Sequence, residues 1–165
     1  MPSIISDMVF SVSNGKKLKI DEKPIKSMLS YVQDMDEKDE AGGVILGRVI
    51  KESNNVVIDV NTEPMEGDIR SRTRFKRGKK RHQKIINEIW KKSEGTCNYL
   101  GEWHTHPEKN PSPSSVDIKS WTRILKKDVF STKYLYFIIV GTESIGVWEG
   151  NRENLKIKKL NNVKR

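Results

Sequence analysis

The sequence predicts an α/β fold in which a mixed, largely antiparallel sheet is flanked by helices. Three features of its 165 residues support this class. A hairpin signal opens the chain, and two later runs, 44–50 and 134–140, are almost continuously apolar, as in buried strands. Three amphipathic helical segments alternate with the strands, which favours helices packed against the sheet. A chain of this length suits one domain, so we expect residues 1–165 to fold together.

The first half of the chain begins with Asn14-Gly15 between short apolar-alternating runs, which predicts a hairpin over residues 8–20. The segment 24–35 predicts a helix, because its apolar residues follow helical spacing and Pro24 suits a first-turn position. Strands are predicted at 43–50 and 55–61. The stretch 62–78 has little apolar content, and we expect an ordered loop there.

The second half opens with an amphipathic helix at 79–92, whose predicted apolar face consists of His82, Ile85, Ile86, Ile89 and Trp90. Because His82 lies on that face, we expect a packed, hydrogen-bonded histidine rather than a metal ligand. Residues 115–128 predict a third helix with an inward face of Ile118, Trp121, Ile124 and Leu125. Strands are predicted at 97–103, 134–140, 145–149 and 155–160, the last with the alternation of an edge strand.

Composition limits the class of protein further. A single cysteine, Cys97, excludes an internal disulfide and fits a reducing compartment. Residues 1–10 lack the basic start and the long apolar run of a signal peptide. No stretch approaches the length needed to span a membrane, so we expect a cytoplasmic protein without a membrane partner.

The net charge of +9 is concentrated in one segment, Arg70–Lys84. This segment holds nine of the 31 Lys and Arg residues and no acid, and elsewhere basic and acidic residues are equal in number. Such a patch can meet nucleic acid, an acidic protein surface or phosphate. It can equally be a solvated loop and helix face, and the charge pattern alone leaves both interpretations open.

The stretch Gly101–Asp117, GEWHTHPEKNPSPSSVD, carries the most chemistry. Because side chains alternate along a strand, His104 and His106 point the same way and Thr105 points to the opposite face. Ser114 follows a Pro-Ser-Pro turn at a helix N-cap position, with Asp117 at capping-box spacing. An isolated His-x-His is common on exposed strands, and an isolated Ser-x-x-Asp is more often only a cap. Together, two imidazoles and one carboxylate leave a coordination position open, which is typical of a catalytic zinc site.

This stretch resembles the JAMM (JAB/MPN) metalloprotease motif, H-[ST]-H-P-x6-S-x2-D, and residues 104–117 match it element by element. Gly101-Glu102-Trp103 is similar to the family's G-W-Y lead-in. Glu40–Gly47, EAGGVILG, is similar to the family's upstream glutamate before a glycine-rich apolar strand. The resemblance spans roughly residues 5–160 and implies the α-β-α sandwich of MPN domains, which is like that of cytidine deaminases.

The resemblance implies one zinc ion per chain, held by His104, His106 and Asp117 with water in the fourth position. It assigns the general base to Glu40 and oxyanion stabilisation to Ser114, whose hydroxyl could also cap the helix. A carboxylate at the mouth of a buried strand would be partly desolvated, which raises its pKa and suits it to proton transfer. Glu102, two residues before His104 on the same strand face, is a rival base.

The implied reaction is hydrolysis of a peptide or isopeptide bond between a ubiquitin-like modifier and its target. The chain looks like bacterial JAB proteases found beside ubiquitin-type activating and conjugating enzymes. In antiphage operons that signal through cyclic oligonucleotides (CBASS), such proteases remove a nucleotidyltransferase, a CD-NTase, from its conjugated target. Three alternatives remain: a catalytically silent scaffold of the same fold, a nucleic-acid-binding module that uses Arg70–Lys84, and an iron oxygenase with the same donor set.

Overall fold

A computed structural model describes residues 6–127 and 132–163 of the chain. Its three helices are α1 (Glu22–Leu29), α2 (Lys79–Lys92) and α3 (Ser115–Leu125). The first six strands are β1 (Met8–Ser11), β2 (Lys17–Ile20), β3 (Gly42–Val49), β4 (Val56–Asn61), β5 (Ile69–Ser71) and β6 (Arg74–Lys76). The others are β7 (Asn98–Thr105), β8 (Tyr134–Val140), β9 (Ile145–Asn151), β10 (Ile157–Lys159) and β11 (Asn161–Asn162).

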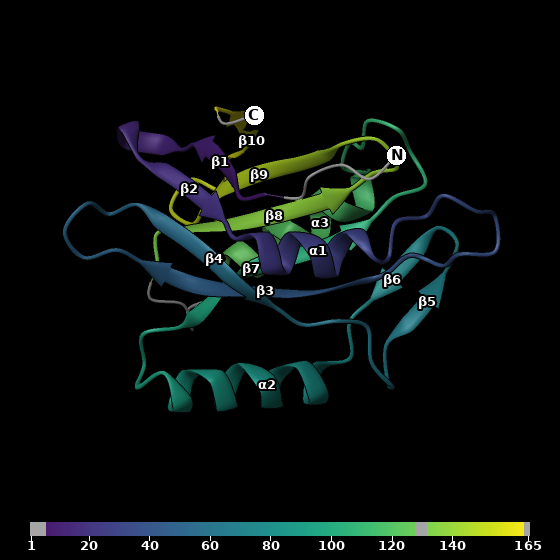
Figure 1. Ribbon diagram of the computed structural model, residues 1–165, viewed down its shortest axis with the longest axis horizontal. Coiled ribbons are helices and arrows are strands. Elements are labelled where there is room, and N and C mark those ends of the chain that lie inside the picture. Colours follow the sequence, from purple (N-terminus) through teal and green to yellow (C-terminus); the bar gives the residue numbers. More distant parts are fainter. Residues whose placement is uncertain (1–5, 128–131, 164–165) are drawn as a thin grey trace.

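Nine strands form the main sheet in the order β10-β9-β8-β7-β3-β4-β2-β1-β11, and β5 pairs only with β6 (Figure 1). The pairs β2–β4 and β7–β8 are parallel, and the other pairs are antiparallel. The predicted mixed, largely antiparallel sheet is therefore confirmed. The strand β10 lies at one end of the order and β11 at the other, although only Leu160 separates them in the chain. The sheet must therefore curl until its two ends are neighbours.

The helices cover both faces of the curled sheet. On the inner face, Ile25 and Met28 of α1 join a large apolar core that includes Trp103 and Ile138. On the outer face, α3 packs Trp121, Ile124 and Leu125 on β8 and β9, where the Trp121 and Phe137 rings stack at 4.6 Å. Figure 1 shows α1 in front of the sheet, α3 behind it and α2 beyond β3. This arrangement is a three-layer sandwich with a curved central layer.

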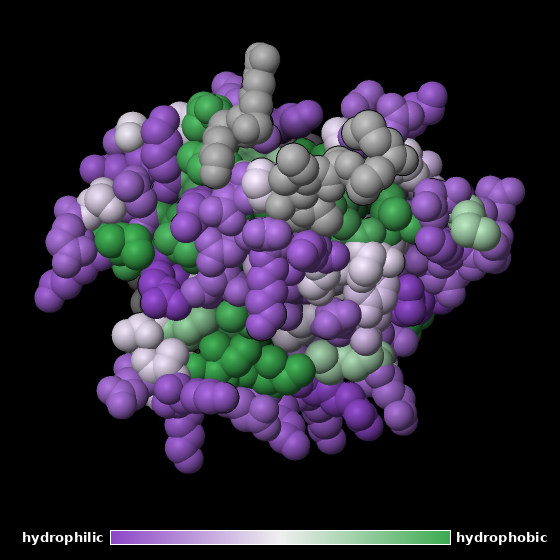
Figure 2. Space-filling view, viewed as in Figure 1, coloured by the Kyte–Doolittle hydropathy of each residue, from purple (hydrophilic) through white to green (hydrophobic). Residues whose placement is uncertain are grey.

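The helix α2 lies against the outer face of β3 and β7. Ile86 and Ile89 pack on Val44 and Leu46. Figure 2 shows the apolar residues between α2 and the sheet and hydrophilic residues along the outer edge of this helix. The predicted helix at 79–92 and the predicted strand at 134–140 are both confirmed to the residue. The hairpin at 8–20 also forms, with Asn14 and Gly15 in the left-handed region that its turn requires.

The predicted helix at 24–35 is wrong at both ends, because α1 spans only Glu22–Leu29. Apolar spacing continues to Val32, but the Ser30 hydroxyl donates to the Ser27 carbonyl oxygen at the helix end. The chain then leaves the helical path, and the Gln33 side chain hydrogen-bonds the Arg72 carbonyl oxygen and the Thr105 hydroxyl. A tertiary contact therefore overrides the local pattern.

Two further expectations for irregular and edge segments are corrected. The loop predicted at 62–78 contains the β5–β6 hairpin, whose short, mostly exposed strands carry few apolar residues and give no clear strand pattern. Asp68 braces the loop by accepting from the Met65 and Gly78 amides. The strand predicted at 155–160 begins later, because Leu155 has a φ of 63° and cannot join a strand. Within this segment only β10 forms, and β11 follows after Leu160 at the other end of the strand order.

Two residues placed inward by helical spacing are exposed. Trp90 is 53% exposed because it lies near the end of α2, after the residues that pack on β3. Ile118, in the first turns of α3, is 37% exposed, whereas the other three predicted inward residues of this helix are buried. The structure ends α3 at Leu125, and the predicted end at Asp128 lies outside the described residues.

Two expectations from composition can be compared with the structure. Cys97 is a free, buried thiol. Burial raises its pKa to about 11, so it is a poor nucleophile at neutral pH. Among the described residues, no helix has both the length and the apolar character needed to cross a membrane.

Candidate metal centre

The end of β7 supplies two imidazoles to the same point. His104 is the penultimate residue of β7, and His106 directly follows the strand. Their Nε2 atoms lie 3.0 Å apart. Both side chains are largely buried. Thr105, between them, is fully buried and hydrogen-bonds on the opposite side, to the Ala41 amide and to Gln33. The alternation predicted for this strand is therefore confirmed.

The start of α3 brings a carboxylate to the same point. The Ser114 hydroxyl accepts from the Asp117 amide at 3.1 Å, and Asp117 Oδ2 accepts from the Ser114 amide at 2.8 Å. This is the predicted capping box. The same carboxylate lies 3.2 Å from His104 Nε2 and 3.2 Å from His106 Nε2. Capping thus fixes the direction in which Asp117 faces the two imidazoles.

These three side chains have the chemistry and spacing of a metal-binding set. Their ligand atoms are separated by 3.0–3.2 Å. Tetrahedral zinc with bonds of about 2.0–2.2 Å would place its ligand atoms about 3.3 Å apart. His106 Nδ1 lies 3.0 Å from Glu108 Oε1, an interaction that turns Nε2 towards the site. Glu108 was not among the predicted site residues, although a carboxylate two residues after a candidate ligand is a detectable signal.

Glu40 lies across from the imidazoles, just before β3. The Gly42 position of β3 pairs with His104 on β7, which brings the two segments together. Ligand atoms of Glu40, His104 and His106 all lie within 4.8 Å of one another, and Glu40 is 6% exposed. Burial raises the pKa of Glu40 to about 7, the direction that the sequence predicts; His106 opposes this shift and Asp117 adds to it. A water molecule held between these groups would be within reach of this carboxylate.

The electrostatics of the centre favour a cation. Burial alone would lower the pKa of His106, but hydrogen bonds to Asp117 and Glu108 raise it to about 9. Burial alone would raise the pKa of Asp117, but hydrogen bonds from His104 and His106 hold it well below its usual range. Asp117 is therefore an anion at neutral pH, and the proton on His106 lies beside the position that a metal ion would fill.

Glu102, the rival candidate for the base, is held in a different environment. Its carboxylate accepts from Arg77 Nη2 and from the Tyr99 hydroxyl, each at 2.9 Å. Burial would lower the pKa of Arg77, but Glu102 outweighs this effect and raises it. The Glu102 carboxylate is therefore committed to a mostly buried ion pair beside the centre.

His82 and the basic segment have mainly structural contacts. His82 is fully buried, with Nδ1 2.7 Å from Thr62 Oγ1 and Nε2 3.0 Å from Asp68, so the expected packed histidine is confirmed. Within Arg70–Lys84, three arginines bind inside the molecule: Arg70 and Arg72 donate to backbone carbonyls and Arg77 to Glu102. Arg72 and Arg77 are thereby partly buried, whereas Arg70 and the other basic residues of the segment are exposed.

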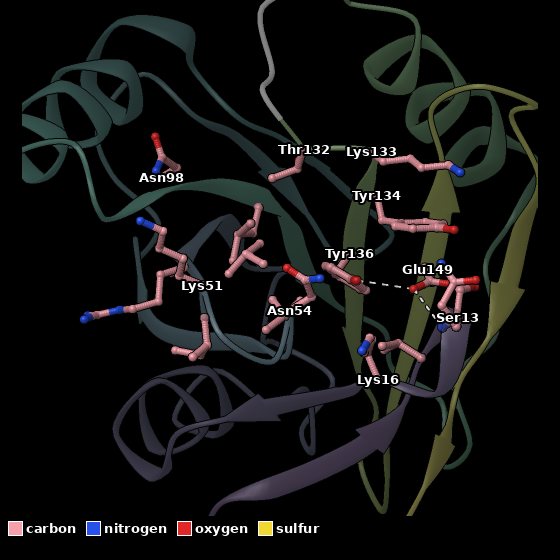
Figure 3. A pocket seen from close by; sticks show the side chains of 18 of the residues that line it. Ser13, Lys16, Lys51, Asn54, Asn98, Thr132, Lys133, Tyr134, Tyr136 and Glu149 are labelled. Carbon is pink, nitrogen blue, oxygen red and sulfur yellow. Dashed lines mark hydrogen bonds between the residues drawn. The ribbon is translucent and has the colours of Figure 1, made fainter.

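A cavity of about 830 Å³ lies at the other end of the same strands (Figure 3). The C-terminal end of β3 and the N-terminal ends of β7 and β8 line it, whereas the candidate centre uses the opposite ends of β3 and β7. Glu149 is buried in its wall and accepts from the Ser13 hydroxyl at 2.5 Å and the Tyr136 hydroxyl at 3.2 Å. This cavity is therefore separate from the candidate centre.

The fold and the centre together define a hydrolase of the JAMM type. The chain belongs to the prokaryotic JAB family, because the model of prokaryotic homologues of the JAB domain matches residues 22–153. A protein from Escherichia coli strain TW11681, named CD-NTase/cGAS isopeptidase, is 34% identical over 156 residues, which cover 94% of this chain and 95% of that protein.

Two further comparisons agree with this assignment. A Vibrio cholerae protein of the same name is 35% identical over 147 residues, 89% of each chain. The solution structure of a protein from Desulfitobacterium hafniense matches with a TM-score of 0.57 and 17% identity, and the match covers 85% of this chain and 87% of that one. At this identity the structural match supports the fold alone.

Proposed function

We propose that this chain is a zinc-dependent isopeptidase that hydrolyses the bond joining a CD-NTase, conjugated in a ubiquitin-like way, to its target. The observation that carries the proposal is the convergence of His104, His106 and Asp117 within 3.0–3.2 Å, with Glu40 beside them. The printed name of the relatives supports the substrate class.

In this proposal His104, His106 and Asp117 hold one zinc ion per chain. When bound, zinc would supply a Lewis acid that lowers the pKa of water and polarises the scissile carbonyl group. Glu108 keeps the His106 ring oriented through its contact with Nδ1. The capping box does the same for Asp117, so two of the three proposed ligands have their own orienting partner.

The proton transfers fall to Glu40. As a carboxylate it takes a proton from the attacking water, and as the acid it gives that proton to the departing lysine amine. The burial that raises its pKa to about 7 suits both directions of transfer near neutral pH. Ser114 is exposed at the start of α3, where its hydroxyl can donate to the oxyanion while its oxygen still caps the helix.

The proposal also implies partners. An isopeptide bond must be formed before it can be hydrolysed, so an associated enzyme of the ubiquitin-activating or conjugating type must act upstream. We place the reaction in the cytoplasm and in antiphage defence, where the substrate named for the relatives would be conjugated.

Removal of the aspartate tests the metal set. Asp117→Asn keeps an oxygen for the capping box but weakens metal binding, whereas Asp117→Ala removes both. We expect both variants to lose the zinc equivalent and to cleave a purified CD-NTase conjugate at least about 10³-fold more slowly. Metal content is measured by mass spectrometry and folding by circular dichroism.

The control is Ser115→Ala, at the exposed position after the cap. A full zinc equivalent in Asp117→Ala would contradict the ligand assignment. Zinc-loaded wild type that leaves the conjugate intact would favour the silent scaffold, and iron in place of zinc would favour an oxygenase.

A further inference from the structure

A buried polar pair lies behind the metal centre, on the inner side of β7. Gln33 is 1% exposed and Thr105 is fully buried. Gln33 follows α1 by only a few residues, in a segment whose neighbours Asp34 and Met35 are exposed. Because burying an amide costs free energy unless its groups are hydrogen-bonded, the partners of this pair show what it holds together.

The Gln33 amide joins three separate segments. Its Nε2 donates to the Arg72 carbonyl oxygen at 2.9 Å and to the Lys38 carbonyl oxygen at 3.2 Å. Its Oε1 accepts from the Thr105 hydroxyl at 2.8 Å. Both amide protons and the amide oxygen are therefore used, and only this orientation of the amide pairs donors with acceptors.

Thr105 carries the connection to the segment that holds Glu40. Its hydroxyl accepts from the Ala41 amide at 2.9 Å, and its own amide donates to the Ala41 carbonyl oxygen at 2.9 Å. Its two chain neighbours are His104 and His106. The residue that separates the two candidate metal ligands therefore also binds the backbone directly after the candidate base.

The backbone of Glu40 itself is held by the β5–β6 hairpin. The Glu40 amide donates to the Ser71 carbonyl oxygen at 2.8 Å, and the Glu40 carbonyl oxygen accepts from Arg70 Nε at 2.8 Å. Gln33 binds the next residue of that hairpin, Arg72. One buried amide thus connects the hairpin, the segment before β3 and the end of β7.

From these contacts we infer that Gln33 and Thr105 are positioning residues that fix Glu40 relative to the two histidines. The inference rests on the proposed function, because it assigns a role in the same reaction. A displacement of about 1 Å at a reacting group can cost about 10²-fold in rate, so a support that joins all three segments is expected to act on turnover. The bound substrate touches neither residue, because both are buried.

Isosteric substitutions test this inference. Thr105→Val and Gln33→Met keep the shape but remove the hydrogen bonds, whereas Thr105→Ser keeps the hydroxyl. We expect each of the first two to lower kcat about 10–100-fold with KM for the conjugate changed less than about twofold and one zinc equivalent retained. Thr105→Ser should stay within about threefold of wild type.

Two controls sharpen the result. Gln83→Met makes the same chemical change on the exposed face of α2 and should leave kcat unaltered. If Gln33 and Thr105 act through their shared hydrogen bond, the double variant should be no slower than the slower single variant.

Several outcomes would overturn the inference. The first is an unaltered kcat in Thr105→Val, and the second is a change confined to KM. The third is loss of zinc, which would show that the pair positions the metal ligands rather than Glu40. A wild-type enzyme that cleaves no conjugate would remove the proposed function instead, before any variant is compared.

Amide hydrogen exchange of the wild-type protein tests the inference without a variant and without an activity assay. The amides of Glu40 and Ala41 should exchange hydrogen as slowly as those of the buried residues of β3, because their acceptors are the Ser71 carbonyl and the buried Thr105 hydroxyl. Rapid exchange at both amides would show that the segment is not fixed and would end the inference.

Discussion

Two buried glutamates lie near opposite ends of the central strands, and they differ in their hydrogen-bond partners. Glu149 is 2% exposed, and its carboxylate accepts from the Ser13 hydroxyl and amide and from the Tyr136 hydroxyl (Figure 3). Glu40 is 6% exposed, and within the described residues no hydrogen bond to its carboxylate oxygens is found. One carboxylate is satisfied by fixed donors, and the other faces the two histidines.

Burial by itself therefore does not identify a catalytic carboxylate. A cavity of about 830 Å³ lies beside Glu149, where burial raises the pKa of Tyr136 and Glu149 raises it further, so that the phenol stays protonated and donates. The available proton acceptor is Glu40, because fixed donors do not occupy its oxygens.

The largest effect is expected from Glu40→Gln. The amide cannot accept the proton of the attacking water, so we expect kcat to fall by about 10²–10⁴-fold while one zinc equivalent stays bound. Single-turnover cleavage of the conjugate and metal analysis of the same sample measure both. Turnover equal to wild type would show that another group is the base.

The second effect concerns zinc affinity and pH. His106 holds a proton below about pH 9, and zinc must displace it, so binding releases a proton and strengthens as pH rises. Between pH 6 and pH 8 we expect affinity to increase by up to about a hundredfold. Competition with a chromogenic chelator measures the slope. Glu108→Gln removes one of the contacts that raise this pKa and should flatten the curve, and a flat wild-type curve would contradict the ligand role.

The third prediction applies the same change, glutamate to glutamine, to Glu149 beside the cavity. In Glu149→Gln the Ser13 and Tyr136 hydroxyls lose their carboxylate acceptor, so the free energy of unfolding should fall by about 1–3 kcal/mol. kcat per folded molecule should stay at the wild-type value. Urea unfolding and activity assays on one preparation separate the two quantities. A fall in kcat without a change in the free energy of unfolding would show that Glu149 contributes to turnover, and would contradict the difference drawn between Glu149 and Glu40.

The smallest effect on turnover is expected from Glu102→Gln. This side chain is bound to Arg77 and Tyr99, so the change should weaken a buried ion pair but alter kcat less than about threefold. Conjugate cleavage with zinc content as the control measures it. A loss as large as that of Glu40→Gln would transfer the base to Glu102.

Strong local patterns predicted much of the fold. The strand at 134–140 and the helix at 79–92 were found to the residue, because a continuous apolar run and an amphipathic period are each set by short-range chemistry. The end of α1, the β5–β6 hairpin and the exposure of Trp90 were not predictable in this way. Each depends on which distant surface covers the segment, and spacing along the chain does not carry that information.

Local sequence patterns were enough to bring the three proposed ligands together, because strand alternation aligns His104 with His106 and capping-box spacing directs Asp117. Which carboxylate is free to accept a proton depends instead on long-range contacts. Glu40 and Glu102 are both plausible bases in the sequence, but folding brings Arg77 and Tyr99 to Glu102 and brings the histidines to Glu40. The reason is physical: the availability of a carboxylate depends on the donors and the water around it, and segments far apart in the chain supply these.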